Sequence, residues 1–489
     1  MSLNFRYYIR LLYEGQALGY ASVLENSCDK FYFYCMKTKS YQKDSVGFYS
    51  LGCAKNLTDS EIMLGILVKE GFQIVDPVEG CEIIIVNTCA FIDDAKEESI
   101  EAVLEAVNLK NQDKCRFIIV SGCLSQRYAQ QLYELIPEVD RIVGLDQIEQ
   151  LGWICRNLPR RSCPKIDPPV KKYPIREFPK VHLTPGHYAY LKIADGCRNK
   201  CNYCVIPQVR GPLRSREQDD ILEEANFLNE LKVKELNIIA QDISSYGVDF
   251  DNGPTLIDLL RELITFSSFK WIRLLYIYPY HFDDELLEIM SSEAKVIPYL
   301  DLPIQHIDDA ILKRMGRQGD SHYIYELIEK IRKKIPEISL RTTIIVGYPG
   351  ETEKQFNKLI HFIKDIEFDH LGVFQYSRES GTPAAKMKYQ VSKKVKEQRE
   401  KDILKIQAEI SKKRLRRFKG RKVDVIVEDQ VQTPDDEVYF AARAPFQAPE
   451  VDGAIFIRGD SETVKYGDFR KVEISKAGTY DLFGRWCPE

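Results

Sequence analysis

Three cysteines close together in the sequence are the residues best suited to chemistry in this chain. Cys197, Cys201 and Cys204, called here the loop trio, follow the spacing C-x3-C-x2-C, and the next cysteine is Cys487. A structural zinc site usually takes four ligands in two pairs, and bacterial ferredoxins use C-x2-C-x2-C with a fourth cysteine elsewhere. Three thiolates on a four-iron cluster leave one iron without a protein ligand. The spacing therefore predicts a cluster with one open coordination site; the alternatives are three reduced thiols in a loop or an incomplete zinc site.

Three further cysteines, far apart in the sequence, occupy equivalent places in an N-terminal α/β pattern. Cys53, Cys89 and Cys123, called here the N-terminal trio, each follow a short apolar run, at residues 46–51, 83–86 and 117–120. Helical periodicity then covers residues 59–70, 93–108 and 125–135. This alternation predicts a doubly wound parallel sheet, whose ligands bind beyond the carboxyl ends of the strands. We expect the three thiols to share one ligand; the alternative is that they are small core residues placed alike by coincidence.

Composition limits the classes of function. The chain has 489 residues, enough for several domains, and its net charge of -4 gives no general attraction to nucleic acid or to an anionic membrane. Thirteen cysteines, an odd number in a long chain, indicate a reducing compartment and metal or redox chemistry rather than a disulfide scaffold. We find no secretory signal and no apolar run of the roughly 18–20 residues that would span a bilayer. These features predict a cytoplasmic protein with no membrane contact.

Changes in composition predict the domain boundaries. Residues 1–44 lack sustained periodicity, and we expect them to be an extension outside the native fold, with Met36 as the natural start. Residues 45–158 form the N-terminal domain, and the Pro-rich, basic segment 159–184 reads as a linker. We assign no role to Cys28, Cys35, Cys155 and Cys163. Cys81 and Cys115 also receive none, because they precede their strands and belong at the opposite edge of the sheet.

Residues 185–418 predict an incomplete barrel of six β/α units. Six apolar runs alternate with helical patterns, at residues 188–193, 235–240, 271–277, 297–302, 340–346 and 370–375. Active sites in β/α barrels gather at the carboxyl ends of the strands, and the loop trio follows the first run. Polar residues such as Gln241, Asp242 and His306 follow later runs. The turn Gly347-Tyr-Pro-Gly-Glu351 closes the fifth run and opens a helix, where backbone N–H groups are free to meet a ligand.

The C-terminal part combines a charged helix with a small β-domain. The pattern of residues 392–418 predicts one helix that ends in a basic run. Such a run is typical of a solvent-exposed face or of a surface that binds the phosphates of RNA. From residue 419 to 489 the pattern has period two, with strands expected at 423–427, 454–457 and 469–474. Short strands separated by turn residues predict a small antiparallel β-barrel of the OB type.

Taken together, these parts resemble the radical S-adenosylmethionine (SAM) methylthiotransferase family. The resemblance rests on Ser50-Leu-Gly-Cys-Ala-Lys-Asn-Leu57, Val86-Asn-Thr-Cys-Ala-Phe91, Ser121-Gly-Cys-Leu-Ser-Gln-Arg-Tyr128 and Leu191-Lys-Ile-Ala-Asp-Gly-Cys197. It implies an N-terminal methylthiotransferase domain, a partial (β/α)6 radical SAM barrel and a C-terminal TRAM domain. Leu302-Pro-Ile-Gln-His306, Tyr376–Pro383 and Tyr480–Gly484 resemble the branch that methylthiolates the β-carbon of an aspartate in the S-twelve protein of the small ribosomal subunit. The alternatives are methylthiolation of a transfer RNA adenosine and a non-catalytic iron–sulfur protein that binds RNA or carries electrons.

The resemblance also implies cofactors, partners and site residues. It assigns a [4Fe-4S] cluster to each trio: the loop trio would cleave SAM to a radical, and the N-terminal trio would hold the sulfur to be inserted. SAM contacts are expected from Gly347, Pro349, Gly350, Arg341 and Gln241. For Arg341 a structural salt bridge is the alternative, and for His306 a structural hydrogen bond. The implied partners are the S-twelve protein, free or on the ribosome, an electron donor and, as a further possibility, RNA.

Overall fold

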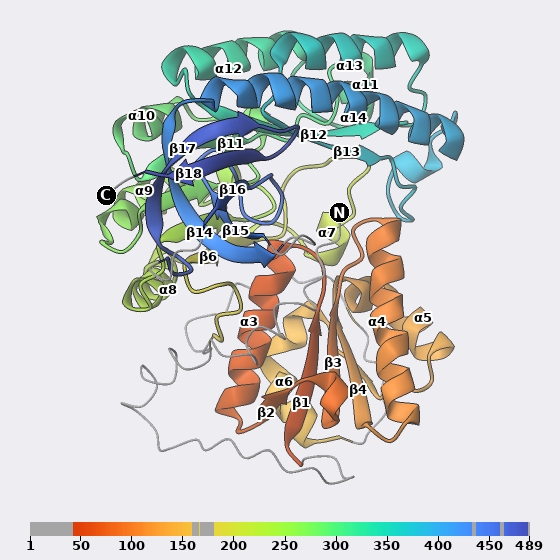
Figure 1. Ribbon diagram of the computed structural model, residues 1–489. Helices are drawn as coiled ribbons and strands as arrows, with labels where there is room; N and C mark the ends of the chain where they lie inside the picture. The colour runs from red at the N-terminus through yellow and green to blue at the C-terminus, as the bar shows by residue number, and fades with distance from the viewer. Residues whose placement is uncertain (1–42, 159–165, 167–179, 433–436, 460–463, 488–489) are drawn as a thin grey trace. The chain divides into compact units, whose positions relative to one another are not determined.

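The computed structural model describes residues 43–158, 166, 180–432, 437–459 and 464–487 (Figure 1). The chain divides into two compact units: one holds residues up to Thr184 together with 206–212, and the other holds 185–205 and 213 onward. Residues 1–42 of the expected extension, with Cys28, Cys35 and Met36, lie outside the described residues, as do Cys163 and most of the expected linker. Each unit is described by itself below.

The first unit is built on a five-stranded parallel sheet. Its order is β2-β1-β3-β4-β5, and every adjacent pair is parallel, which confirms the predicted doubly wound fold. Residues Ile83–Val86 and Ile118–Val120 of the central strands are almost wholly buried, as expected where helices cover both faces. The elements are β1 (Ser45–Ser50), α3 (Ala54–Lys69), β2 (Gln73–Val75), β3 (Cys81–Thr88), α4 (Asp93–Asn111), β4 (Cys115–Gly122), α5 (Cys123–Leu135), β5 (Arg141–Ile142) and α6 (Leu151–Arg156). A short helix, α7 (Ile206–Val209), also belongs to this unit.

The second unit contains an open parallel sheet of six strands in sequential order. These are β6 (Tyr188–Lys192), β9 (Glu235–Ile239), β10 (Trp271–Leu274), β11 (Val296–Asp301), β12 (Ser339–Val346) and β13 (His370–Gln375). Each strand pairs in parallel with the next, so the predicted partial (β/α)6 barrel is confirmed. The third strand ends at Leu274, earlier than its apolar run predicted, because Tyr276 takes a left-handed conformation with φ of 65°.

Helices cover the outer face of this sheet and bury a continuous core. They are α8 (Gln218–Glu230), α9 (Leu256–Thr265), α10 (Asp284–Ser292), α11 (Asp309–Arg314), α12 (Ser321–Lys334) and α13 (Glu353–Ile366). Side chains cap several of them at the start; Thr255, Asp308, Asp320 and Thr352 each accept a hydrogen bond from a backbone N–H of the first turn. These caps explain why each helix begins soon after a strand-end loop.

The charged helix α14 (Lys393–Leu415) is packed on one face. Ile403, Gln407 and Ile410 are buried at helical spacing, and Gln407 donates to the carbonyl of Phe368. In the basic run, Arg414 and Arg417 both pair with Asp369, at 3.0 and 2.9 Å. The run is therefore partly neutralised within the unit, and only its remaining cations form the predicted solvated face.

The C-terminal strands close into a five-stranded barrel in the order β14-β15-β16-β18-β17. They are β14 (Lys422–Gln432), β15 (Val438–Arg443), β16 (Ile455–Arg458), β17 (Phe469–Ala477) and β18 (Leu482–Trp486). The predicted small barrel is confirmed. One pair, β16 with β18, is parallel rather than antiparallel, and β15 and β18 were absent from the sequence prediction.

This small barrel packs against the amino-terminal ends of the six-stranded sheet. The first residues of five strands each contact it: Tyr188 with Glu450, Glu235 with Arg443, Trp271 with Phe469, and both Ser339 and His370 with the carbonyl of Phe446. The carboxyl ends of the strands, where the loop trio begins, therefore lie at the other end of the sheet from the small barrel.

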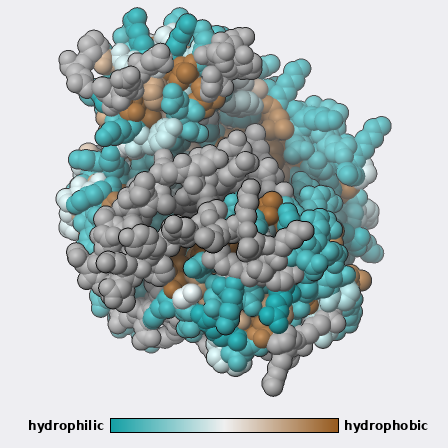
Figure 2. Space-filling view, turned by 60° about the horizontal axis from the view of Figure 1, so that its bottom comes forward, coloured by the Kyte–Doolittle hydropathy of each residue, from teal (hydrophilic) through white to brown (hydrophobic). Residues whose placement is uncertain are grey.

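Within the described residues, no helix is long and apolar enough to cross a membrane. The face of the molecule seen in Figure 2 is mainly hydrophilic where the residues are described, with apolar side chains in scattered patches.

Candidate metal centres

The sheet of the first unit brings the N-terminal trio to one edge. Cys53 follows β1, Cys89 follows β3 and Cys123 begins α5 directly after β4. Because β1, β3 and β4 are adjacent and parallel, their carboxyl ends meet at this edge. The order of the strands reverses between β1 and β3, which is the position where doubly wound sheets bind their ligands. Cys81 and Cys115 are paired in register at the opposite edge, as predicted.

Two glycines shape the backbone around the N-terminal trio. Gly52 and Gly122 precede Cys53 and Cys123 and have φ of 95° and 92°, where an L side chain is strained. A Cβ on Gly52 would lie 2.8 Å from the Cβ of Cys89, and one on Gly122 would lie 2.4 Å from a backbone oxygen of the neighbouring strand. The thiols of Cys53 and Cys123 are thus positioned by turns that accept only glycine.

A buried arginine lies against the N-terminal trio. Arg210 comes from the segment 206–212, which joins this unit from far along the sequence. Its Nη2 pairs with Asp59 at 2.9 Å and lies 3.6 Å from the sulfur of Cys123, and its side chain is almost fully buried. The guanidinium therefore provides a fixed positive charge beside a thiol that would be a thiolate in a cluster.

The three thiols of the N-terminal trio influence one another. Burial, followed by the charges of Cys123 and Cys53, raises the pKa of Cys89 to about 12. Burial also raises the pKa of Cys123, against the opposing charge of Arg210. Desolvation acts to raise the pKa of Cys53, but Lys55 and Arg210 outweigh it, and the pKa lies below its usual value. Ionising all three thiols together requires a compensating cation, which iron would supply.

The loop trio follows β6 and is tied to the strand-end loops beside it. Asn199 donates to Asp242 at 2.8 Å, and its backbone N–H points to the sulfur of Cys197 at 3.4 Å. Asp242 also accepts from Ser245 at 2.7 Å. On the other side of the loop, the amide of Asn202 donates to the carbonyl of Arg314 at 2.9 Å. These bonds hold the loop from both sides.

The turn after α11 completes the support of this loop. Asn202 N donates to the carbonyl of Met315 at 2.8 Å, and a Cβ on Gly316 would lie 2.7 Å from the carbonyl oxygen of Lys200. The buried Arg317 donates to the hydroxyl of Tyr203 at 3.2 Å. The loop that carries the three thiols is thus held in place by protein contacts alone.

Of the expected SAM contacts, Gln241 has the clearest sign of a missing partner. Both polar atoms of its side chain are buried, and neither finds a hydrogen-bond partner among the described residues. Buried polar atoms are nearly always paired, so an orphaned amide at the carboxyl end of β9 fits a ligand-binding role. The assignment remains a prediction.

The turn at Gly347, Pro349 and Gly350 lies at the carboxyl end of β12, as predicted. Its backbone conformation and close neighbours already explain why glycine is needed at two of these positions. Gly347 and Gly350 have φ of 73° and 76°, and a Cβ would lie 2.3 Å from Lys396 and 2.2 Å from Arg314, respectively. Gly347 N donates to the carboxylate of Glu351. Contact of this turn with SAM therefore stays a prediction.

Arg341 is not placed beside that turn. It is the third residue of β12, five residues before Val346, and pairs with Asp452 of the small barrel at 2.6 Å. Five residues of strand span about 17 Å. The structural salt bridge that the sequence left open is present, which favours that role over a contact with SAM.

His306 also forms the structural hydrogen bonds that the sequence left open as its alternative role. Its Nδ1 accepts from the backbone N–H groups of Ile307 and Asp308, both at 2.9 Å, so the proton belongs on Nε2. Nε2 then donates to Glu351 at 3.3 Å, and Glu351 pairs with Arg399 at 3.0 Å. The imidazole is fully buried and joins the loops after β11 and β12 to helix α14.

Comparison with known families matches all three parts of the chain. The model of the uncharacterized protein family UPF0004 matches residues 45–144, that of the radical SAM superfamily residues 191–363 and that of the TRAM domain residues 420–487. Among curated proteins, the ribosomal protein uS12 methylthiotransferase RimO of Geobacter sulfurreducens is 44% identical over 449 residues, which cover 91% of this chain and 99% of that protein. RimO of Natranaerobius thermophilus is 44% identical over 444 residues, with coverage of 91% and 99%.

The chain belongs to the RimO family of radical SAM methylthiotransferases. Among solved structures, the radical SAM methyltransferase TsrM of Kitasatospora setae shares the fold with a TM-score of 0.53 at 14% identity, covering 70% of this chain and 77% of that one. Enzymes of the RimO family use SAM and two [4Fe-4S] clusters.

The two trios suit the clusters of the RimO family better than they suit single metal ions. In the part of the chain that the structure describes, no three His, Cys, Asp or Glu side chains are arranged to hold one ion. The thiolates of a four-iron cluster bind different irons and need not converge on one point. Thiolate is also the ligand type that iron–sulfur clusters select. The six cysteines would therefore hold the two clusters, three at each site.

Arg210 and Asn199, one beside each site, were not among the predicted site residues. Asp59 lies within a predicted helix, but no local pattern marks its partner Arg210, which is 151 residues away. Asn199 sits inside the C-x3-C spacing and gave no signal that it binds Asp242. Contacts that join distant segments leave no periodic trace in the sequence.

Proposed function

We propose that this protein methylthiolates the β-carbon of an aspartate in the small-subunit ribosomal protein uS12. The observation that carries the proposal is the presence of two separate three-cysteine sites, each at the carboxyl ends of parallel strands, in a chain that RimO relatives match over nearly its whole length. A single cluster with one open coordination site is compatible with many different radical reactions. A second cluster site in its own domain adds a place for the sulfur that is to be inserted.

The cluster on the loop trio and SAM, when bound, would supply the radical chemistry that an unactivated C–H bond requires. The residues of the chain position these cofactors. Asp242 and Asn202 fix the loop trio, and Arg210 balances negative charge at the second site. Gln241 offers SAM a buried amide that has no hydrogen-bond partner in the described part of the chain. Gly347, Pro349 and Gly350 offer backbone groups at the neighbouring strand end.

The charge of the C-terminal module favours a protein substrate over transfer RNA. Residues 420–487 contain nine Lys and Arg and thirteen Asp and Glu. Nucleic-acid affinity depends on cations that neutralise phosphates, so an acidic module is a poor RNA anchor. A ribosomal protein, which is itself basic, is attracted by the same charge.

We assign residues 45–158 to the methylthiotransferase domain, 185–418 to the radical SAM domain and 419–489 to the TRAM domain. The partners are uS12, free or on the ribosome, and an electron donor, and the cytoplasm is the compartment where uS12 is made. RNA, the further possible partner, would meet the basic run at the end of α14 rather than the acidic module.

The test is mass spectrometry of uS12 and of transfer RNA nucleosides from a strain that lacks the gene. We expect the mass added to the uS12 aspartate to disappear and the methylthiolated adenosines to stay unchanged. The opposite pattern would assign the enzyme to transfer RNA. Loss of neither modification would favour the non-catalytic alternative.

A further inference from the structure

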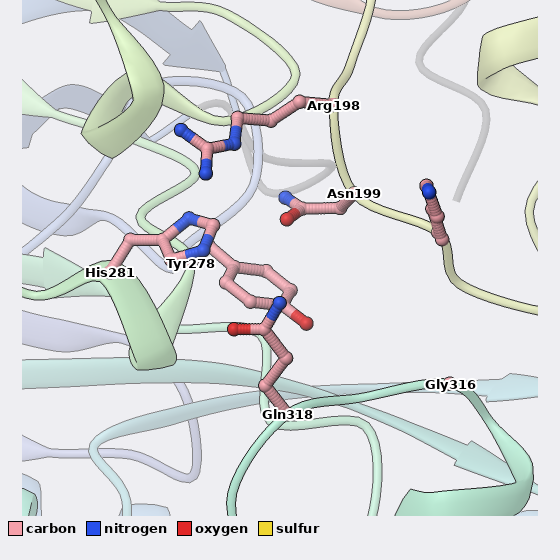
Figure 3. A pocket seen from close by; sticks show the side chains of 7 residues that line it. Arg198, Asn199, Tyr278, His281, Gly316 and Gln318 are labelled. Carbon is pink, nitrogen blue, oxygen red and sulfur yellow. The ribbon is translucent and has the colours of Figure 1, made fainter. Parts of the chain in front are cut away.

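A pocket opens directly beside the loop trio. It has a volume of about 270 Å³ and is lined by Arg198, Asn199 and Lys200 of the cysteine loop, by Tyr278 and His281 after β10, and by Gly316 and Gln318 after α11. Figure 3 shows the side chains of Arg198, Asn199, Tyr278, His281 and Gln318 pointing toward a common space. Three of its lining residues lie between Cys197 and Cys201 in the sequence.

The pocket carries positive charge on a chain that is acidic overall. Its lining contains two cations, an imidazole, two amides and a phenol, and no carboxylate. Arg198 and Lys200 are exposed, and neither forms an ion pair with any residue that the structure describes. The whole chain has a net charge of -4. A local positive site therefore stands beside the loop that would hold the radical SAM cluster.

The walls of the pocket are rigid. Asn199 is held by Asp242 at 2.8 Å, and His281 lies 3.5 Å from the same carboxylate. Tyr278, the aromatic wall, has the guanidinium of Arg317 over its ring at 4.5 Å. These contacts fix three walls of the pocket, and Arg198 and Lys200 add exposed positive charge to its lining.

We propose that this cationic pocket is the docking site of an acidic one-electron carrier protein that reduces the cluster on the loop trio. The inference rests on the proposed function, because it gives that cluster its electron. In this step the carrier's reduced cofactor loses one electron, the cluster gains it, and no atom or proton is transferred. A carrier that docks on residues 198–200 has only the cysteine loop between its own cofactor and the cluster.

A transient partner fits these charges better than a resident anion. A permanently bound anion would oppose the addition of an electron to a neighbouring cluster, whereas an acidic carrier leaves after it has delivered the electron. Electron-transfer encounters bury little surface and rely on charge to bring the partners together. Two exposed cations in the lining of a small pocket suit such a weak, fast encounter.

The test compares two reductants on the anaerobically purified holoenzyme. The first is flavodoxin in its hydroquinone form, an acidic protein; the second is reduced methyl viologen, a small cation that the pocket does not attract. The measured quantity is the rate of 5′-deoxyadenosine formation from SAM in a single turnover at low ionic strength. Electron paramagnetic resonance confirms that each variant carries both clusters.

For the double variant Arg198→Glu/Lys200→Glu, we expect the flavodoxin-driven rate to fall about 10-fold or more and the viologen-driven rate to stay within about 2-fold. The loss should shrink as salt is added, since screening weakens charge steering. The matched control Arg198→Lys/Lys200→Arg keeps the charge and should keep the rate.

Gln318 supplies a second pair of variants outside the cysteine loop. Gln318→Glu should slow the flavodoxin-driven reaction, and Gln318→Lys should speed it. Equal changes with both reductants, or a flavodoxin-driven rate that none of the variants alters, would overturn the proposal. Failure of the proposed function gives a different result: the unaltered enzyme with viologen would cleave SAM but leave a uS12 peptide unmodified, or would not cleave SAM at all.

Discussion

Glu235 offers a sharp test of how the small barrel is held to the six-stranded sheet. Its carboxylate lies between Arg273 at 2.8 Å and Arg443 at 2.5 Å, and all three side chains are at most 2% exposed. Burial acts to raise the pKa of Glu235, but Arg443 and Arg273 outweigh burial and lower it from 4.5 to about 2. A carboxyl with this change in pKa contributes about 3 kcal/mol to the free energy of unfolding at neutral pH.

The substitution Glu235→Gln removes the charge and takes the carboxylate partner from the buried Arg273, whereas Arg443 keeps only Glu428, at 2.6 Å. Breaking a buried pair in this way costs about 3–5 kcal/mol, in line with the value from the pKa. The matched control is Glu288→Gln, which removes a carboxylate paired with Lys334 at 2.6 Å but with side chains 38% and 65% exposed. Exposed pairs contribute at most about 1 kcal/mol, so the control should unfold nearly as the unaltered protein does.

Urea unfolding followed by tryptophan fluorescence measures the difference. Trp153 is 63% exposed and lies in the first unit, so Trp153→Phe leaves Trp271 and Trp486 as reporters of the second unit alone. The pKa of Glu235 is depressed, so its stabilisation is complete above the unfolded value of 4.5 and is lost only as the pH falls from 4.5 toward 2. The difference between Glu235→Gln and the unaltered protein should therefore be constant between about pH 6 and pH 8. A difference below about 1 kcal/mol, or one equal to that of Glu288→Gln, would refute the reasoning.

Three further predictions concern the metal centres. Cys201→Ala should abolish 5′-deoxyadenosine formation, whereas Cys89→Ala should retain it and stop the addition of sulfur to uS12, as mass spectrometry of the peptide would reveal. Arg210→Gln should make the second cluster lose iron to a chelator about 10–100-fold more readily, with the first cluster unaffected in electron paramagnetic resonance; equal iron loss from both would contradict a local effect. Asp242→Ala should leave the loop trio less well positioned and slow SAM cleavage by about 100-fold or less, while Asp283→Ala, a change at an exposed helix cap, should leave the rate intact.

Much of the fold followed from the sequence because its patterns are local. The six apolar runs of the barrel are strands that end at most three residues from their predicted limits, since buried parallel strands need continuous apolar residues. Strand β15 was missed because Ala441, Ala442 and Arg443 break the alternation that marks a strand, and its pairing with β14 and β16 decides its conformation. Spacing and position after the strands singled out the six cysteines, and their role as cluster ligands stays a prediction.

The contacts around the site could not be predicted in the same way. Arg341 and His370 share Asp452, which lies in a loop of the small barrel more than 80 residues further along the chain. His306 reads equally well as a residue of the site or as a structural hydrogen-bonding residue, and the two backbone N–H groups at its Nδ1 favour the structural role. Such pairings depend on the packing of distant elements, which local periodicity does not record.

The contacts between the small barrel and the strand ends also set the order in which this protein can be completed during its synthesis. Glu235 and Arg341 lie in strands that are made first, and their partners Arg443 and Asp452 follow 208 and 111 residues later. Until then Arg341 lacks the carboxylate with which it pairs, and the contacts between the small barrel and the strand ends have not formed. A chain truncated before Arg443 would therefore be less stable, and an easier substrate for proteases, than a chain that includes the small barrel.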